Sequence, residues 1–195
     1  MTITSVNRYL TRSEMEGNAE FIAGFFYGIG WTMSAVAAML GNMETESTIN
    51  PGIYENLDDT TTSNGFGLVQ WTPNTKYKEW ADANGFGSDY GDIIGQVTRI
   101  AYELNNGLQW IPTTRYNMTF EEFSKSTSSP EYLAQAFLYN YERPADLNQP
   151  NRSTQARRWY DFLTTLSGGS IDYPEYKPGN MSKILLYYAG THRRW

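Results

Sequence analysis

The stretch Gly41–Pro51, which reads G-N-M-E-T-E-S-T-I-N-P, most constrains what this chain can fold into. Apolar residues between Val36 and Met43 repeat at helical spacing and predict a buried helix over Thr32–Glu46. The Asn-Pro dipeptide then ends that helix, because a residue that precedes proline disfavours the α conformation. Glu44 and Glu46 both flank the apolar stripe. Helical geometry alone therefore leaves open whether one carboxylate has a chemical role or both are solvated.

The segment after this helix lacks helical periodicity. Residues 51–64 are mostly polar, and Ser63–Pro73 follows with the sequence S-N-G-F-G-L-V-Q-W-T-P. Asn64-Gly65 is a strong turn signal, so we expect a small β-hairpin or loop insert beside the helix. The glycines on either side of Phe66 indicate that the backbone approaches a neighbouring element or a ligand.

The rest of the chain to residue 166 reads mainly as helices. Capping boxes begin at Thr11 and Thr119, and Ser129-Pro130 pairs a cap with proline at the first helical position. Expected helices cover about 11–28, 32–46, 75–84, 92–105, 129–142 and 153–166, and the capping box at Thr119 indicates a further helix start. The fold class is therefore mainly α, or α+β with a small insert, with six or seven helices in one domain over residues 1–166.

Residues after 166 differ in composition. Ser167-Gly-Gly-Ser170 is a flexible-linker signal, and we expect a linker over 167–180. Residues 181–195 form an apolar and basic tail that is too short for a core of its own. We expect this tail to dock onto a partner or onto the domain itself, and a disordered terminus is the alternative.

Composition excludes several classes of function. The chain has no cysteine, and its one histidine, His192, is near the end, so thiolate or His-rich metal sites and His-based triads are not expected. We expect no metal and no cofactor. The net charge of −6 argues against a nucleic-acid partner. We also find neither an apolar signal peptide nor a stretch that could span a membrane.

Three motifs in order make the chain resemble the lysozyme-like superfamily, which includes goose-type lysozymes and lytic transglycosylases. They are Glu46-Ser47 at the helix end, Gly67-Leu-Val-Gln70, and the segment Ala136–Tyr141. The chain is still more similar to the phage tail lysozymes of short-tailed phages. That resemblance rests on the first stretch, on N-G-F-G-L-V-Q-W-T-P and on Y-E-R-P-A, and it covers about Arg8 to Leu166.

The resemblance implies a lysozyme-like fold that binds and cleaves the glycan strands of peptidoglycan. Glu46, the carboxylate directly before serine, would be the general acid, and Glu44 does not match that position. Substrate-binding residues would come from the three motifs: Ser47, Phe66, Gly67, Gln70, Trp71, Tyr139 and Asn140. Met43, Phe66 and Trp71 are candidates for an apolar wall that raises the pKa of the acid.

The second catalytic group stays open. Asp58 and Asp59 follow Glu46 by twelve and thirteen residues, where a base or stabiliser could lie, but both also suit turns. Glu142 is another candidate, although Glu-Arg-Pro is better explained by a structural ion pair at a helix end. Without a second carboxylate, a lytic transglycosylase that gives anhydro-muramyl products becomes the alternative.

The resemblance also implies a place for the protein, in the phage particle at the tail tip, where it would open the host cell wall during entry. Other tail proteins would be its partners, through the C-terminal tail. A structural or wall-binding protein without turnover is the competing hypothesis. Related tail proteins often continue into a zinc endopeptidase, but this sequence offers no zinc ligands. We therefore expect no second, peptide-cleaving activity.

Overall fold

The computed structural model describes residues 2–167, which contain seven α-helices and no β-strand. The helices are α1 (Arg12–Gly28), α2 (Met33–Ser47), α3 (Thr75–Ala83), α4 (Ile93–Asn105), α5 (Phe120–Lys125), α6 (Pro130–Phe137) and α7 (Asn151–Ser167). A 3-10 turn, η1 (Glu55–Leu57), and a π-helical turn, η2 (Leu138–Glu142), complete the regular structure. The expectation of a mainly helical domain is confirmed within this part of the chain.

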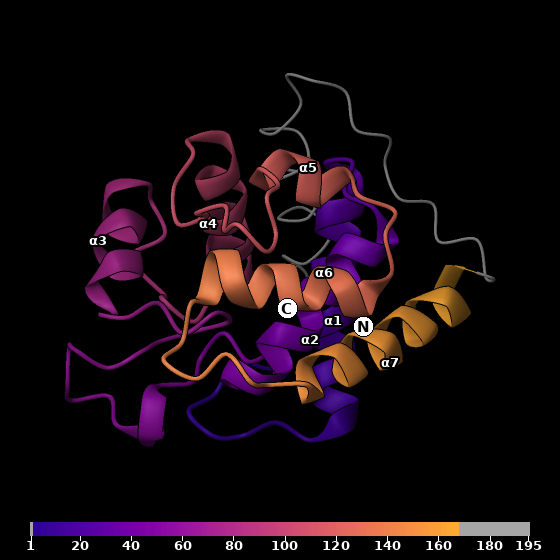
Figure 1. The fold of residues 1–195 in the computed structure, drawn as a ribbon. Coiled ribbons are helices and arrows are strands. Elements are labelled where there is room, and N and C mark those ends of the chain that lie inside the picture. The colour runs from indigo at the N-terminus through magenta and orange to yellow at the C-terminus, as the bar shows by residue number, and fades with distance from the viewer. Residues whose placement is uncertain (1, 168–195) are drawn as a thin grey trace.

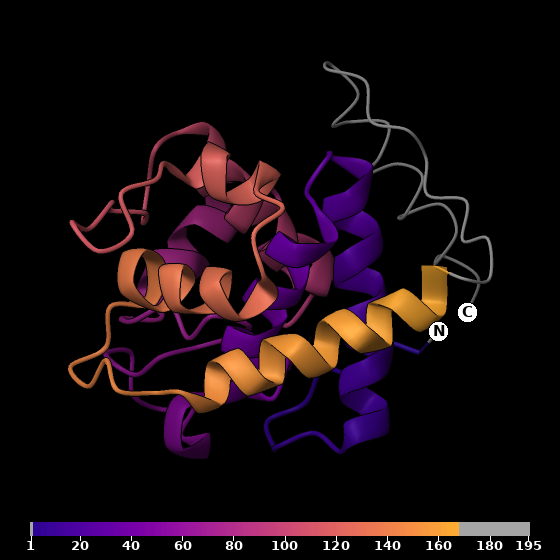
Figure 2. The same cartoon turned by 45° about the vertical axis from the view of Figure 1, so that its right-hand side comes forward.

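Helix α2 lies in the middle of the domain. Its residues from Ser34 to Met43 are all buried, since α6 and α7 cover it from one side and α1 packs against it as well (Figures 1 and 2). Gly41 allows α7 to come close, because a Cβ at this position would lie 2.6 Å from the backbone nitrogen of Ala156. The close packing fixes the last turn of α2, with its two glutamates, relative to α7.

The helix starts follow the capping signals in the sequence. Thr11 caps α1 and Thr119 caps α5, each in a complete capping box with a glutamate three residues on. Ser129 caps α6 ahead of Pro130, and Asp92 caps α4. These side chains satisfy backbone N–H groups that the helices leave unpaired.

The expected β-hairpin between α2 and α3 is not formed. Only isolated bridges join Tyr54 to Phe66 and Phe66 to Trp71. Within the insert the backbone takes positive φ values at Asn56, Leu57, Gly67 and Gln70. The 3-10 turn η1 also interrupts the first half of the segment. A chain that turns this often cannot hold two extended strands in register, so the insert is a compact loop.

The helix expected over 129–142 changes character before its end. It is α-helical to Phe137 and continues as η2 to Glu142, after which Arg143 has a left-handed backbone with φ 50°. π-helical turns often occur at functional sites. Here the turn carries Glu142 to the side of the domain on which α2 ends.

No helix within the described part of the chain has the length and apolar character that a membrane crossing requires. The expected linker, apart from Ser167 at the end of α7, lies outside the described residues. The expected tail over 181–195 and its docking role lie outside them too.

Candidate active site

A cleft of about 460 Å³ opens where the end of α2, the insert and the end of η2 meet. This volume is in the usual range for sites that bind small ligands. The cleft contains carboxylate, amide and aromatic side chains from segments that are distant in sequence. Its lining includes Tyr9, Glu46, Tyr54, Glu55, Gln70, Trp71, Gln109, Glu142 and Arg143.

The two glutamates in the last turn of α2 have different surroundings. Glu44 accepts hydrogen bonds from Arg158 and from the indole of Trp159, at 2.9 and 2.8 Å, so α7 holds both of its oxygens. Glu46 instead lines the cleft, where its side chain is 20% exposed. Helical periodicity could not separate the two residues, but the packing of α7 does.

Arg152, in the first turn of α7, is the ion-pair partner of Glu46. Its Nη2 lies 2.5 Å from Glu46 Oε1, and the side chain is almost completely buried. Nη1 donates to Asn42 Oδ1 at 3.0 Å, and Nε donates to Gln149 Oε1 at 2.7 Å. Three partners therefore fix the guanidinium group, and with it the position of the Glu46 carboxylate.

Glu142 is the second carboxyl group that is enclosed in this cleft. The side chain as a whole is half-buried, but its Oε1 is shielded from solvent and has no hydrogen-bond partner. Burial raises the pKa of the Glu142 carboxyl well above its usual range, and the nearby charge of Glu46 raises it further. The cationic group of Arg152 acts in the opposite direction.

The expected structural ion pair between Glu142 and Arg143 is not formed. Arg143 Nη1 donates to the backbone carbonyls of Gln109 and Asn140, the latter at 2.7 Å. No salt bridge joins Glu142 to any other described residue. The interpretation of Glu-Arg-Pro as an ion pair at a helix end was therefore wrong, because the Arg143 guanidinium binds backbone carbonyls instead of the Glu142 carboxylate.

Gln70 and Trp71 form one wall of the cleft. Trp71 Nε1 donates to Glu103 Oε1 at 2.9 Å, and Glu103, which is buried in α4, also accepts from Arg99 and from Tyr141. Gln70 Nε2 donates to the carbonyl of Gly67 at 2.9 Å. Of the three residues expected to form an apolar wall around Glu46, only Trp71 lines the cleft, while Met43 and Phe66 are buried behind it.

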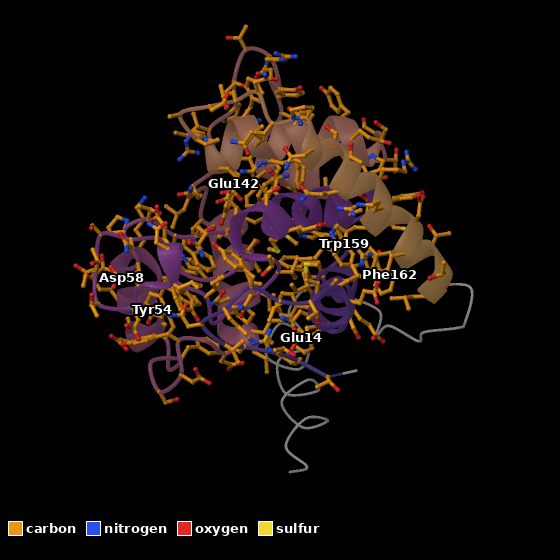
Figure 3. The ribbon with its side chains drawn as sticks, turned by 90° about the horizontal axis from the view of Figure 1, so that it is seen from below. Glu14, Tyr54, Asp58, Glu142, Trp159 and Phe162 are labelled. Atoms are coloured by element: carbon orange, nitrogen blue, oxygen red, sulfur yellow. The ribbon has the colours of Figure 1, made fainter. Side chains whose placement is uncertain are left out.

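The structure does not bring Asp58 and Asp59 to the cleft. Figure 3 shows Asp58 at the edge of the molecule, away from Glu142. The carboxylate of Asp58 accepts hydrogen bonds from Thr60, Thr61 and Asn64. These bonds lower the pKa of Asp58 to about 2, and the bond from the Thr60 hydroxyl has the largest effect. Asp59 is exposed beside it. Both residues are placed as turn residues, which was the alternative interpretation.

Three further candidates lie behind the cleft wall and not on its surface. Ser47 Oγ is buried and donates toward the carbonyls of Met43 and Leu68, so it ties the end of α2 to the insert. Phe66 is 2% exposed and packs against Tyr54, which does line the cleft. Gly67 has φ +79° and lies against Gln96, so the close backbone approach expected here is to a protein side chain.

Tyr139 and Asn140, the remaining substrate-binding candidates, are also outside the cleft. Tyr139 lies in a separate hollow beside Arg115, whose Nη1 donates to the Tyr139 hydroxyl at 3.1 Å. Asn140 is fully buried and holds the loop before α5 through Thr113 and the carbonyl of Tyr116. Its amide is thus occupied by the protein.

Sequence reasoning missed Arg152 and Tyr9. Arg152 precedes the helix expected over 153–166, and nothing in its local sequence links it to Glu46. Tyr9 is 64% exposed at the mouth of the cleft, a degree of exposure that only the folded chain reveals. Within residues 2–167, no group of three or more His, Asp or Glu side chains could hold a metal ion.

Comparison with known proteins identifies a family that matches most of the chain. A family model described as phage tail lysozyme matches residues 17–163. Morphogenesis protein 1 of Bacillus phage B103 is 52% identical over 172 residues, which are 88% of this chain and 46% of that protein. The chain therefore spans a little under half the length of this relative.

Proposed function

Because the chain belongs to the phage tail lysozyme family, we propose that it is a peptidoglycan hydrolase of the phage particle. The bond cleaved is the β-1,4 glycosidic bond between N-acetylmuramic acid and N-acetylglucosamine. The observation that carries this proposal is the cleft in which the family's expected acid, Glu46, meets the enclosed carboxyl group of Glu142. Most glycosidases use two carboxyl groups that flank the glycosidic bond they cleave.

Glu46 is the proposed general acid. Cleavage requires a proton on the leaving oxygen and stabilisation of positive charge that develops at the anomeric carbon. Arg152 fixes the carboxyl group of Glu46 at the end of α2, so that it meets the bound sugar in one orientation. Asp58 and Asp59 have no part in this proposal, since both lie in the turn.

The walls of the cleft suit a glycan chain. Tyr54 and the exposed Tyr9 provide aromatic faces for sugar rings, while Trp71 lies almost completely buried in the cleft wall. The amide nitrogens of Gln70 and Gln109 donate to backbone carbonyls, so these two residues offer their amide oxygens to acetamido N–H groups. Ser47, Phe66 and Gly67 support this surface from behind. Tyr139 and Asn140 have a structural role in this proposal, since they contact Arg115 and Thr113 outside the cleft.

Mass spectrometry of the soluble products from purified peptidoglycan tests the reaction. A hydrolase releases fragments with reducing N-acetylmuramic ends. Anhydro-muramyl ends would instead identify a lytic transglycosylase, in which one carboxyl group serves in turn as acid and base and the 6-hydroxyl of the sugar attacks. If no sugar fragments appear under any condition that preserves the fold, the proposal fails.

A second candidate, a structural or wall-binding role without turnover, is favoured by the name of the B103 relative, a morphogenesis protein. Under either candidate we place the chain at the tail tip, with other tail proteins as partners and the host wall as its target during entry. Labelling of intact particles with an antibody against the chain tests this placement. We expect a gold-conjugated antibody to label the tail tip in electron micrographs. Particles that carry no label would contradict this placement.

A further inference from the structure

Three carboxyl groups line the cleft. The exposed Glu55 accepts a hydrogen bond from the backbone N–H of Gly65, whereas Glu46 and Glu142 differ in their charge balance. Glu46 has a guanidinium partner at 2.5 Å, whereas Glu142 has no hydrogen bond to its Oε1 and no salt bridge to any described residue. An enclosed oxygen without a partner is costly when it carries charge and far less costly when it is neutral.

The charged groups around Glu142 come from several segments. Glu46 on α2 and Glu103 on α4 add negative charge, while Arg152 on α7 and the adjacent Arg143 add positive charge. Glu103 is already compensated, because Arg99 and the hydroxyl of Tyr141 contact it. Arg143 donates to backbone carbonyls. Arg152 pairs with Glu46, and Lys76, which also lines the cleft, forms no salt bridge within the described residues. Glu142 is therefore left without a cationic partner.

We propose that Glu142 is the second catalytic carboxyl group of this site. It holds a proton in the resting site, and this proton reaches the glycosidic oxygen through Glu46, the proposed general acid. This inference rests on the proposed function, because it assigns the proton that glycoside cleavage consumes. It also gives a role to the one enclosed carboxyl oxygen in the cleft that the fold leaves without a partner.

The proton balance closes over one turnover. The pair gives its proton to the glycosidic oxygen as the bond from that oxygen to the anomeric carbon breaks. A water molecule adds its oxygen to the anomeric carbon and returns one proton to the pair. The two carboxyl groups then hold one proton again, and the net reaction is addition of water across the bond.

Infrared titration of the full chain tests where the proton lies. The carbonyl band of a protonated carboxyl group is followed with pH in wild type, Glu46→Gln and Glu142→Gln, with the exposed Glu121→Gln as the matched control. In wild type, one band is expected to persist well above the ordinary glutamate pKa of about 4.3. It is expected to vanish in Glu142→Gln and to stay in the control. In Glu46→Gln its midpoint should fall, because a nearby negative charge is removed.

Glycan cleavage by the same proteins tests the catalytic part. Glu142→Gln is expected to lose at least about a hundredfold in rate, as general acid–base groups do, while its thermal unfolding temperature stays at or above that of wild type. A band of unchanged midpoint in Glu142→Gln would overturn the inference, and so would a rate within a few-fold of wild type. If wild type cleaves no glycan, the proposed function fails together with the catalytic role, and the infrared titration still decides the location of the proton.

Discussion

The guanidinium group of Arg152 lies 2.5 Å from Oε1 of Glu46, and so joins the first turn of α7 to the last turn of α2 across 106 positions of sequence. Arg158, one and a half turns further along α7, makes the equivalent pair with Glu44 at 2.9 Å. The first pair is at the cleft and nearly buried, whereas Arg158 is half exposed. The two pairs therefore form a natural comparison.

Arg152→Ala is expected to destabilise the fold by about 3–5 kcal/mol, because it leaves Asn42, Gln149 and Glu46 without a buried partner. Arg158→Ala is the matched control and should cost no more than about 1 kcal/mol, since exposed ion pairs contribute little. Urea unfolding of both variants measures the difference. Equal losses in the free energy of unfolding would show that the contacts of Arg152 stabilise the fold no more than the exposed pair of Arg158.

Glu142 gives the stability of the fold a pH dependence of known sign. Its pKa is raised in the folded state, mainly by burial, so the folded chain keeps a proton that the unfolded chain releases. Stability therefore falls as pH rises from about 4.3 toward the folded pKa, by up to about 1.4 kcal/mol per pH unit. Glu142→Gln should remove this slope and be more stable than wild type at neutral pH. Parallel stability–pH curves for the two proteins would contradict this prediction.

Gly67 is expected to tolerate no side chain. A Cβ there would meet Gln96 Oε1 at 2.5 Å with φ +79°, and Gln96 cannot move without losing hydrogen bonds to Leu68, Pro51 and Tyr90. Gly67→Ala should cost more than about 2 kcal/mol. Gly85→Ala, at φ +83° with nothing within 4 Å, should cost only the backbone strain of about 1 kcal/mol. Denaturant midpoints compare them, and a loss at Gly67 no greater than at Gly85 would refute the predicted clash.

Asp58 is predicted to matter for the turn and not for turnover. Its carboxylate is occupied by Thr60, Thr61 and Asn64, so Asp58→Ala should loosen the insert and leave the rate of glycan cleavage within a few-fold of wild type. The exposed Asp59→Ala is the control and should change neither property. A hundredfold loss of rate in Asp58→Ala, with the fold intact, would return Asp58 to the list of catalytic candidates.

Much of the fold could be predicted from local signals. Capping residues such as Thr11, Thr32 and Asp92 fix where helices begin, because their side chains satisfy N–H groups within the same turn. The insert could not be predicted, since Asn64-Gly65 favours a hairpin and no local sequence signal indicates the positive φ values at Asn56 and Gln70. A turn signal describes four residues and carries no information on whether two strands will pair.

The site was only partly accessible from the sequence for a similar reason. The stretch around Glu46 marked the end of a buried helix, and the resemblance selected Glu46 over Glu44. The ion pair with Arg152 depends on how α7 packs across α2, which periodicity does not encode. The enclosure of Glu142 depends on the π-helical turn that ends at that residue. The sequence favoured an ion pair there, because Glu and Arg are adjacent in it.

The most direct test of the account is the rate at which Glu46→Gln releases soluble sugar fragments from purified peptidoglycan. Glu44→Gln is the control, since it lies two residues earlier on α2 and faces Arg158 and Trp159 instead of the cleft. We predict that Glu46→Gln stays folded but loses at least about a hundredfold in rate, while Glu44→Gln stays within a few-fold of wild type. The unfolding temperature of Glu46→Gln is expected to fall, because the nearly buried Arg152 loses its ion-pair partner. A folded Glu46→Gln protein that still cleaves glycan at the wild-type rate would show that Glu46 is not the general acid.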